Sequence, residues 1–168
     1  MTLIGDFEPD DRRLLLHGLE AAAVVVSASS LGRTEETASE GFAMAAYVLE
    51  SAPRLIVHPL LASIVQALSD HAAGGGAFPD YASVVTAPDA RDQAMITVKG
   101  ALSVVDRGAT ADEAAAYRSW LLGIATAVAE AGKEDQGFLG RGGVRVNDAE
   151  LAALAELTDA LGLEAPSA

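Results

Sequence analysis

The sequence predicts an all-α, single-domain bundle of six or seven helices, and three observations support this fold class. Of the 168 residues, 51% are hydrophobic but only 5% are aromatic. Small and unbranched side chains must therefore fill the core, and such side chains lose little freedom in a helix. Apolar residues recur at intervals of three and four in several segments, as they do on one face of a helix. Helix-capping patterns mark where some of these segments begin.

The chain is most simply one domain covering residues 1–168. Its length allows one substantial core, and no linker or internal repeat divides it. We expect the two ends, residues 1–8 and 164–168, to be flexible. A glycine triplet at residues 74–76 should form a mobile connection between helices.

The first helix is expected from residue 9 to residue 31, with residues 14–28 at the centre of the fold. Nearly every side of residues 21–28 is apolar, which is typical of a helix buried on all sides. His17 lies in the more polar first half of this helix. A lone histidine there is more often a hydrogen-bonded packing residue than a metal ligand.

The second helix should begin at Thr34, its cap, and end at Pro53. Its predicted inward stripe consists of Phe42, Ala46 and Leu49. The third helix should have Pro59 at its first position, where proline is well tolerated. Its predicted apolar face comprises Leu60, Leu61, Ile64, Val65 and Leu68. Residues 80–85 are expected to form one helical turn.

The fourth helix is expected to start near Thr86 and Pro88 and to end at residues 106–108. Its predicted apolar stripe is Met95, Val98, Leu102 and Val105. Thr110 and Glu113 have the spacing of a capping box, which should open a fifth helix that runs to about Gly132. The buried stripe of that helix should be Tyr117, Leu121, Ile124 and Val128, with Trp120 beside it as a packing residue.

The most specific stretch is a glycine-rich loop followed by the last helix. Asn147 and Glu150 form a second capping-box pattern. Gly162 should end the helix in a left-handed conformation, with Leu163 folded back onto the last turn. The predicted apolar face of this helix consists of Leu151, Leu154 and Leu161, with Leu157 beside them.

The loop itself is interpreted as a structural reversal that buries Phe138 and Val146. It lacks the side-chain oxygens that an EF-hand calcium loop requires, and a helix precedes it where a nucleotide-binding loop needs a strand. An anion site at Arg141 and Arg145, near the start of the last helix, is physically allowed. Acidic residues in the first turn already occupy that end of the helix.

The net charge of −13 excludes some classes of partner. A nucleic-acid backbone or an anionic membrane surface requires a basic footprint, so neither is expected to bind. A divalent cation or a basic protein partner is compatible with this charge. There are no cysteines, hence no disulfides or thiolate sites. With neither a signal-peptide pattern nor a membrane-spanning segment, a cytoplasmic location is expected.

Two acidic clusters are candidate metal sites. Glu134 and Asp135 crowd the end of the fifth helix, where the helix dipole disfavours negative charge. Glu36 and Glu40 are like-charged neighbours in the first turns of the second helix, although the dipole at that end also accounts for them. Calcium or magnesium binding should be weak, since nothing in the sequence places six oxygens around one point.

The segment KEDQGFLG at residues 133–140, between a long helix and the Asn147 cap, gives the chain a family resemblance. Residues 117–163 resemble the TerB-like, tellurite-resistance-associated family and a related group of bacterial helical proteins. Lys133, Glu134 and residues 138–140 match a KEGGFLG pattern, whereas Asp135 and Gln136 depart from it. The resemblance implies an all-helical, acidic, cytoplasmic protein associated with stress resistance and divalent-cation binding. It transfers no catalytic residue.

Two functional interpretations remain open. The first is a non-enzymatic acidic helical module that binds a divalent cation or a protein partner in a stress response. The second is a small-ligand-binding protein or an enzyme with a pocket between helices. The first is favoured because the sequence contains no recognisable nucleophile–base, zinc-protease or phosphate-loop motif.

Overall fold

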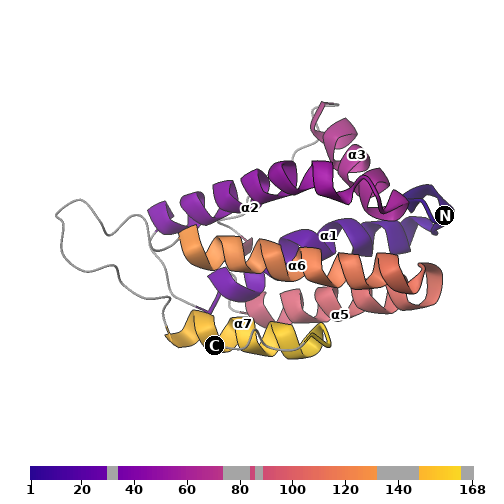
Figure 1. Cartoon of the computed structure of the whole chain (residues 1–168). Helices are drawn as coiled ribbons and strands as arrows, with labels where there is room; N and C mark the ends of the chain where they lie inside the picture. The colour runs from indigo at the N-terminus through magenta and orange to yellow at the C-terminus, as the bar shows by residue number, and fades with distance from the viewer. Residues whose placement is uncertain (30–33, 74–83, 86–88, 132–147, 164–168) are drawn as a thin grey trace.

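The computed structural model describes residues 1–29, 34–73, 84–85, 89–131 and 148–163, apart from the side chains of residues 34–37 and 72. Within these residues the chain is helical and has no strand, so the all-α prediction is confirmed (Figure 1). The elements are η1 (Ile4–Asp6), α1 (Pro9–Ser27), α2 (Thr34–Leu55), α3 (Pro59–Ala73), α5 (Ala90–Gly108), α6 (Ala111–Ala131) and α7 (Asp148–Ala160).

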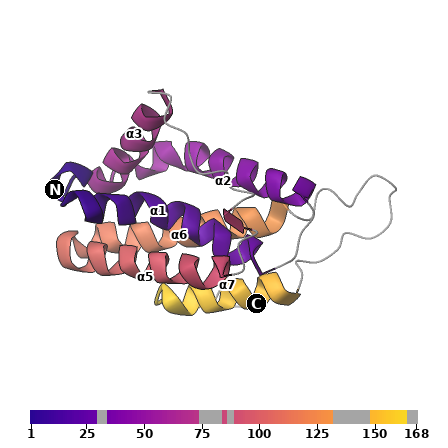
Figure 2. The same cartoon turned by 180° about the vertical axis from the view of Figure 1, so that it is seen from behind.

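α1 is the central helix, as predicted. It packs mainly against α5 and α6 and also contacts α2, α3 and α7 (Figures 1 and 2). Gly18 allows this close packing, because a Cβ atom there would lie 2.5 Å from the Tyr117 hydroxyl and 2.9 Å from the Cβ of Ala101. The Tyr117 hydroxyl donates a 2.7 Å hydrogen bond to the Leu15 carbonyl oxygen. Burial raises the pKa of Tyr117, so the hydroxyl keeps its proton.

α5 and α6 form the walls around α1 with the predicted residues. The predicted stripe of α5 (Met95, Val98, Leu102, Val105) and that of α6 (Tyr117, Leu121, Ile124, Val128) are buried. Trp120 is also buried, and its Nε1 donates a 2.9 Å hydrogen bond to Ser51 Oγ on α2. The interpretation of Trp120 as a packing residue is confirmed.

The predicted capping box opens α6. Thr110 Oγ1 accepts a hydrogen bond from Glu113 N at 3.3 Å, and Glu113 Oε2 accepts one from Thr110 N at 3.1 Å. Glu113 Oε1 also accepts from Leu60 N at the start of α3, at 3.3 Å. Burial alone raises the pKa of this carboxyl group, but hydrogen bonds from Thr110, Thr2 and Leu60 together hold it below its ordinary value. One carboxylate therefore caps α6 and ties α3 to it.

α2 continues beyond its predicted end. It runs to Leu55, with Pro53 inside the helix. Proline has no N–H to donate to the carbonyl of Leu49, the acceptor one turn earlier. Pro53 is exposed, so water can hydrate that carbonyl, and the helix needs to survive only two more residues. For these reasons the proline did not act as a stop.

The predicted inward stripe of α2 is wrong for its two large residues. Phe42 is 80% exposed and Leu49 is 69% exposed, while Ala46 is half-buried. The side chains that face the bundle are Glu40, Met44, Tyr47, Val48, Ser51 and Leu55. α2 carries apolar residues on two faces, and periodicity alone could not tell which face meets the core.

α3 begins at Pro59 as predicted. Its apolar face is buried at Leu60, Leu61 and Ile64 and partly buried at Val65 and Leu68. α5 has Asp89 as its N-cap residue, one residue beyond the expected start at residues 86–88, which lie outside the described residues. Of the turn expected at residues 80–85, only Val84 and Val85 are described, and both are helical.

α7 ends as predicted. Gly162 has a φ of +66°, and the N–H of Leu163 donates to the Thr158 carbonyl oxygen at 3.1 Å. Its buried face is centred on Leu157, with Ala153 and Leu161 also buried and Leu154 partly buried. Leu151 is exposed, so its place in the predicted apolar face is wrong.

Both chain ends were expected to be flexible. The N-terminal residues include η1, where Ile4 N donates to Ser63 Oγ on α3 at 2.8 Å and Phe7 packs over Gly108. Residues 164–168 lie outside the described part of the chain. The glycine-rich loop also lies outside it, together with Phe138, Val146 and the predicted cap Asn147. Among the described helices, none is both long and apolar enough to cross a membrane.

Candidate functional site

Most of the predicted metal ligands fall where the structure gives no side chain. Glu134 and Asp135 lie outside the described residues, and so does the side chain of Glu36. Glu40 is buried on the inner side of α2. Among the described residues, no three acidic or histidine side chains are grouped so that they could hold a metal ion. The metal site therefore stays a prediction.

An apolar row on the outer side of α2 is the most distinctive surface of the described residues. It consists of Ala38, Phe42, Ala45, Leu49 and Ala52 of α2 and of Ile56, the first residue after the helix, and we call it the α2 outer face. Its members follow one another at alternating intervals of four and three residues, the spacing of a coiled-coil seam. Phe42, Leu49 and Ile56 are all largely solvent-accessible, and the exposure of Ile56 is 72%. Scattered apolar side chains are ordinary on a surface, but a contiguous row marks an interaction site.

Large and small side chains alternate along the α2 outer face. Phe42, Leu49 and Ile56 are the large members, and an alanine separates each from the next. Coiled-coil packing inserts a knob from one helix into a hole on the other. Each alanine leaves such a hole between two large neighbours, so the face is shaped to receive a helix with apolar residues at the same spacing.

α2 is held to the bundle by its opposite side, and no described helix covers the row of large side chains on its outer face. Ser51 accepts the hydrogen bond from Trp120, and Tyr47 lies directly over Gly123 of α6. In both views α2 lies along one edge of the bundle, and of the described helices only α3, at the C-terminal end of α2, projects beyond it (Figures 1 and 2). Docking on the outer face therefore need not disturb the core.

The electrostatic setting of this face is acidic. The protein carries a net charge of −13. Glu50 and Arg54 are exposed charged residues of α2, and Glu35 and Glu36 make the first turn of the helix acidic in sequence, whereas Glu40 is buried on the inner side. A partner helix with lysine or arginine beside its apolar row would complement this field.

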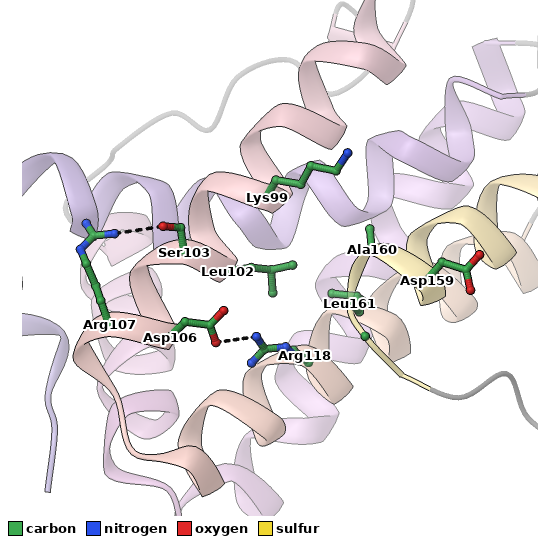
Figure 3. A pocket seen from close by; sticks show the side chains of 10 residues that line it. Lys99, Leu102, Ser103, Asp106, Arg107, Arg118, Asp159, Ala160 and Leu161 are labelled. Atoms are coloured by element: carbon green, nitrogen blue, oxygen red, sulfur yellow. Dashed lines mark hydrogen bonds and ion pairs between the residues drawn. The ribbon is translucent and has the colours of Figure 1, made fainter.

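A groove of about 700 Å³ lies between α5, α6 and the C-terminal end of α7 (Figure 3). It gathers three of the eleven basic residues of the chain, Lys99, Arg107 and Arg118. Arg118 pairs with Asp106 at 2.5 Å, and Arg107 pairs with Asp11 of α1 at 2.5 Å. Because both arginines already have carboxylate partners, we interpret the groove as a network that joins helices rather than as an anion site.

His17 does not have the role expected for it. Its side chain is 52% exposed, and its Nδ1 atom lies 3.7 Å from Glu20 Oε2 at the edge of a hollow between α1 and α5. It is therefore neither a core residue nor part of a metal cluster in the described structure. The two other histidines, His58 and His71, lie at opposite ends of α3, as predicted.

Comparison of the chain with protein-family models, with curated proteins and with solved structures finds no match. The TerB-like resemblance thus remains a prediction.

Sequence reasoning missed the α2 outer face, although a usable signal was present. The alternating four-and-three spacing from Ala38 to Ile56 can be read directly from the sequence. Two apolar faces on one helix indicate two partners, of which the bundle supplies one.

Proposed function

We propose that the chain is a non-enzymatic, TerB-like helical module whose α2 outer face binds a basic amphipathic helix of a protein partner. The observation that carries this proposal is the exposed apolar row with coiled-coil spacing on α2. The cytoplasmic, stress-related setting of the proposal comes from the family resemblance alone.

Burial of the three large side chains supplies the driving force. Fully burying a leucine, isoleucine or phenylalanine side chain contributes about 1.5–3 kcal/mol. Phe42, Leu49 and Ile56 start largely exposed, so most of that gain is still available to a partner. Part of it is spent on ordering the two surfaces, which sets the affinity below the simple sum.

The net charge selects the kind of partner. A basic helix approaches a chain of charge −13 with attraction, whereas a second copy of this chain approaches with repulsion. The attraction acts mainly on the association rate and weakens as salt is added. We therefore commit to a basic helical segment as the occupant of the α2 outer face.

A designed peptide tests the proposal without knowledge of the natural partner. The probe is a 21-residue helix with leucine and alanine at alternating four-and-three spacing and lysine at the flanking positions. A second peptide has glutamate in place of every lysine. We expect the full chain to bind the lysine peptide in fluorescence anisotropy and to bind the glutamate peptide at least about tenfold more weakly.

A pair of matched variants locates the binding. Phe42→Asp places a charge in the middle of the row and should weaken binding at least about tenfold. Ile96→Asp changes another exposed apolar residue, 63% accessible on α5, and should leave binding unchanged. Equal effects from both variants would place the peptide elsewhere. A stable dimer in sedimentation, abolished by Phe42→Asp, would show that a second copy occupies the face and would overturn the proposal of a basic partner.

A further inference from the structure

A hollow of about 410 Å³ lies between α1 and the first half of α5, where Val84 closes one side. None of the α2 side chains that the structure describes lines it, so it is separate from the α2 outer face. Its volume falls within the range of small-molecule pockets, about 300–1,000 Å³. The space exists because the facing helices carry small side chains: Ala21, Ala90 and Ala94 are all buried.

The lining of this hollow is divided into two parts. Ala21, Val24 and Ala94 provide an apolar wall. The polar groups are the carboxylates of Glu20 and Asp89, together with the side chains of His17, Gln93 and Thr97. A mostly apolar wall with a few polar groups is typical of a site that binds the body of a ligand by contact and its polar end by charge.

Glu20 is the more buried of the two carboxylates that line the hollow. Its side chain is only 18% exposed, and the 3.7 Å between its Oε2 and His17 Nδ1 is longer than a hydrogen bond. Burial raises the pKa of its carboxyl group, and the nearby His17 only partly opposes this rise. Burial removes part of the water that would otherwise hydrate this carboxylate, and His17 compensates for the loss only in part. A cation that approaches the carboxylate therefore lowers its free energy.

The second carboxylate that lines the hollow belongs to Asp89, an exposed residue at the start of α5. Asp89 is the N-cap residue of that helix, but its side chain makes no capping hydrogen bond. Together with Glu20 it gives the site two carboxyl groups. These groups and the net charge of −13 of the whole chain disfavour an anionic ligand.

We infer that this hollow binds a small organic cation, with its ammonium group between Glu20 and Asp89 and its apolar body against the alanine–valine wall. A neutral molecule would fill the space but leave the Glu20 carboxylate desolvated. A bare metal ion would leave the apolar wall unused. An ammonium group on a short hydrocarbon body satisfies both parts of the lining, independently of any partner on α2.

Three compounds of the same ring skeleton test this inference on the full chain. Cyclohexylammonium has the required charge and body, cyclohexanol has the body alone, and cyclohexanecarboxylate reverses the charge. We expect cyclohexylammonium to give saturable amide shifts in NMR, centred on residues 17–24 and 89–97. Cyclohexanol should bind at least about tenfold more weakly, and the carboxylate should give no saturable shift.

Two charge-matched variants decide whether Glu20 is responsible. Glu20→Gln should weaken cyclohexylammonium binding at least about tenfold, while Glu50→Gln, which removes an exposed carboxylate on α2, should leave it unchanged. A melting curve checks that each variant is folded. Equal binding of cyclohexanol, equal weakening by both variants, or no saturation at 10 mM cyclohexylammonium would each overturn the inference.

Discussion

α1 and α2 are both long helices rich in alanine, yet the bundle surrounds one and uses only one side of the other. Residues 21–27 of α1 are buried on every side. α2 buries Ser51 and Leu55 but exposes Phe42 and Leu49. The number of apolar residues in a helix therefore does not say how many of its sides are covered. That depends on how closely neighbouring helices can approach.

Small residues allow α1 and its neighbouring helices to pack closely together. Gly18 admits the Tyr117 hydroxyl, and Ala101 of α5 faces the same point. α2 also approaches α6 at a glycine, where Tyr47 lies over Gly123, and the hydrogen bond from Trp120 to Ser51 joins the same two helices, but all these contacts are made by one side of α2. A helix joined in this way keeps its far side available for a partner.

The largest expected effect contrasts two leucines. Leu15→Ala removes a fully buried side chain of α1 and should lower the free energy of unfolding by about 3 kcal/mol through lost burial and a cavity. Leu49→Ala makes the same chemical change on the α2 outer face and should alter it by less than about 0.5 kcal/mol. Urea unfolding measures both. A similar loss for Leu49→Ala would mean that the outer face is covered in the isolated protein.

The next contrast is between Gly18 and Gly123, each replaced by alanine. The new Cβ atom would make its shorter contact at Gly123, yet we expect the smaller loss of stability there. A Cβ atom at Gly18 would meet the hydrogen-bonded Tyr117 hydroxyl and the Cβ of Ala101, neither of which can move away, so Gly18→Ala should cost about 2 kcal/mol. A Cβ atom at Gly123 would lie 1.9 Å from the Tyr47 hydroxyl, the tip of a half-buried side chain that can rotate.

Gly123→Ala should therefore cost less than about 1 kcal/mol, because alanine also favours the helix. Thermal unfolding of the two variants ranks them. The opposite ranking would mean that the α2–α6 contact is as rigid as the packing around α1.

A smaller loss of stability is expected when Glu113 is changed, because its carboxylate connects the start of α3 to the start of α6. Glu113→Gln removes the charge that accepts hydrogen bonds from Thr110 and Leu60, and it should cost about 1–2 kcal/mol at pH 7. The pKa of Glu113 is lowered in the folded state. Its contribution is thus fully present above its ordinary value of 4.5 and is lost as the pH falls through the lowered folded pKa.

The difference between wild type and Glu113→Gln should accordingly shrink below about pH 4.5 in urea unfolding across a pH series. Glu50→Gln, at an exposed site on α2, serves as the control and should differ little from wild type at any pH. A pH-independent cost for Glu113→Gln would show that the charge of this carboxylate is not what stabilises the junction.

The smallest effect concerns cations at the acidic end of α2 and at Glu134 and Asp135. With a dissociation constant on the order of 1 mM, 1 mM calcium stabilises the fold by about 0.4 kcal/mol. This corresponds to a rise of roughly 1 °C in Tm. Glu134→Gln combined with Asp135→Asn should remove the rise if those residues bind the ion, and Glu36→Gln should remove it if α2 does. No change in wild type with calcium or magnesium would end the metal hypothesis.

The features of the fold that depend on residues close together in the sequence were predictable. The capping box of Thr110 and Glu113 and the left-handed Gly162 each depend on residues within one or two turns, and both are confirmed. The central place of α1 was also predictable, because a helix apolar on every side must be surrounded. The bond from Glu113 to Leu60 was not, since it joins residues 53 positions apart.

The site was harder to predict for a related reason. Phe42 and Leu49 were placed inside because their spacing fits a helix face, but whether that face meets the core depends on Trp120 and Gly123, far away in sequence. The hollow beside Glu20 likewise arises only when Ala21 of α1 meets Ala90 and Ala94 of α5. An alanine in a sequence does not reveal whether the space beside it is filled.

Trp120 gives the molecule a built-in optical reporter. It is the single tryptophan of the chain, and its indole is buried between α6 and α2, where it donates to Ser51. Ultraviolet emission from the unlabelled protein therefore comes chiefly from the interface between α2 and α6. If α2 separates from α6 before the packing around α1 opens, emission will move to longer wavelength before the helical circular dichroism signal falls. A single heating experiment can thus time the release of one helix against the melting of the whole bundle.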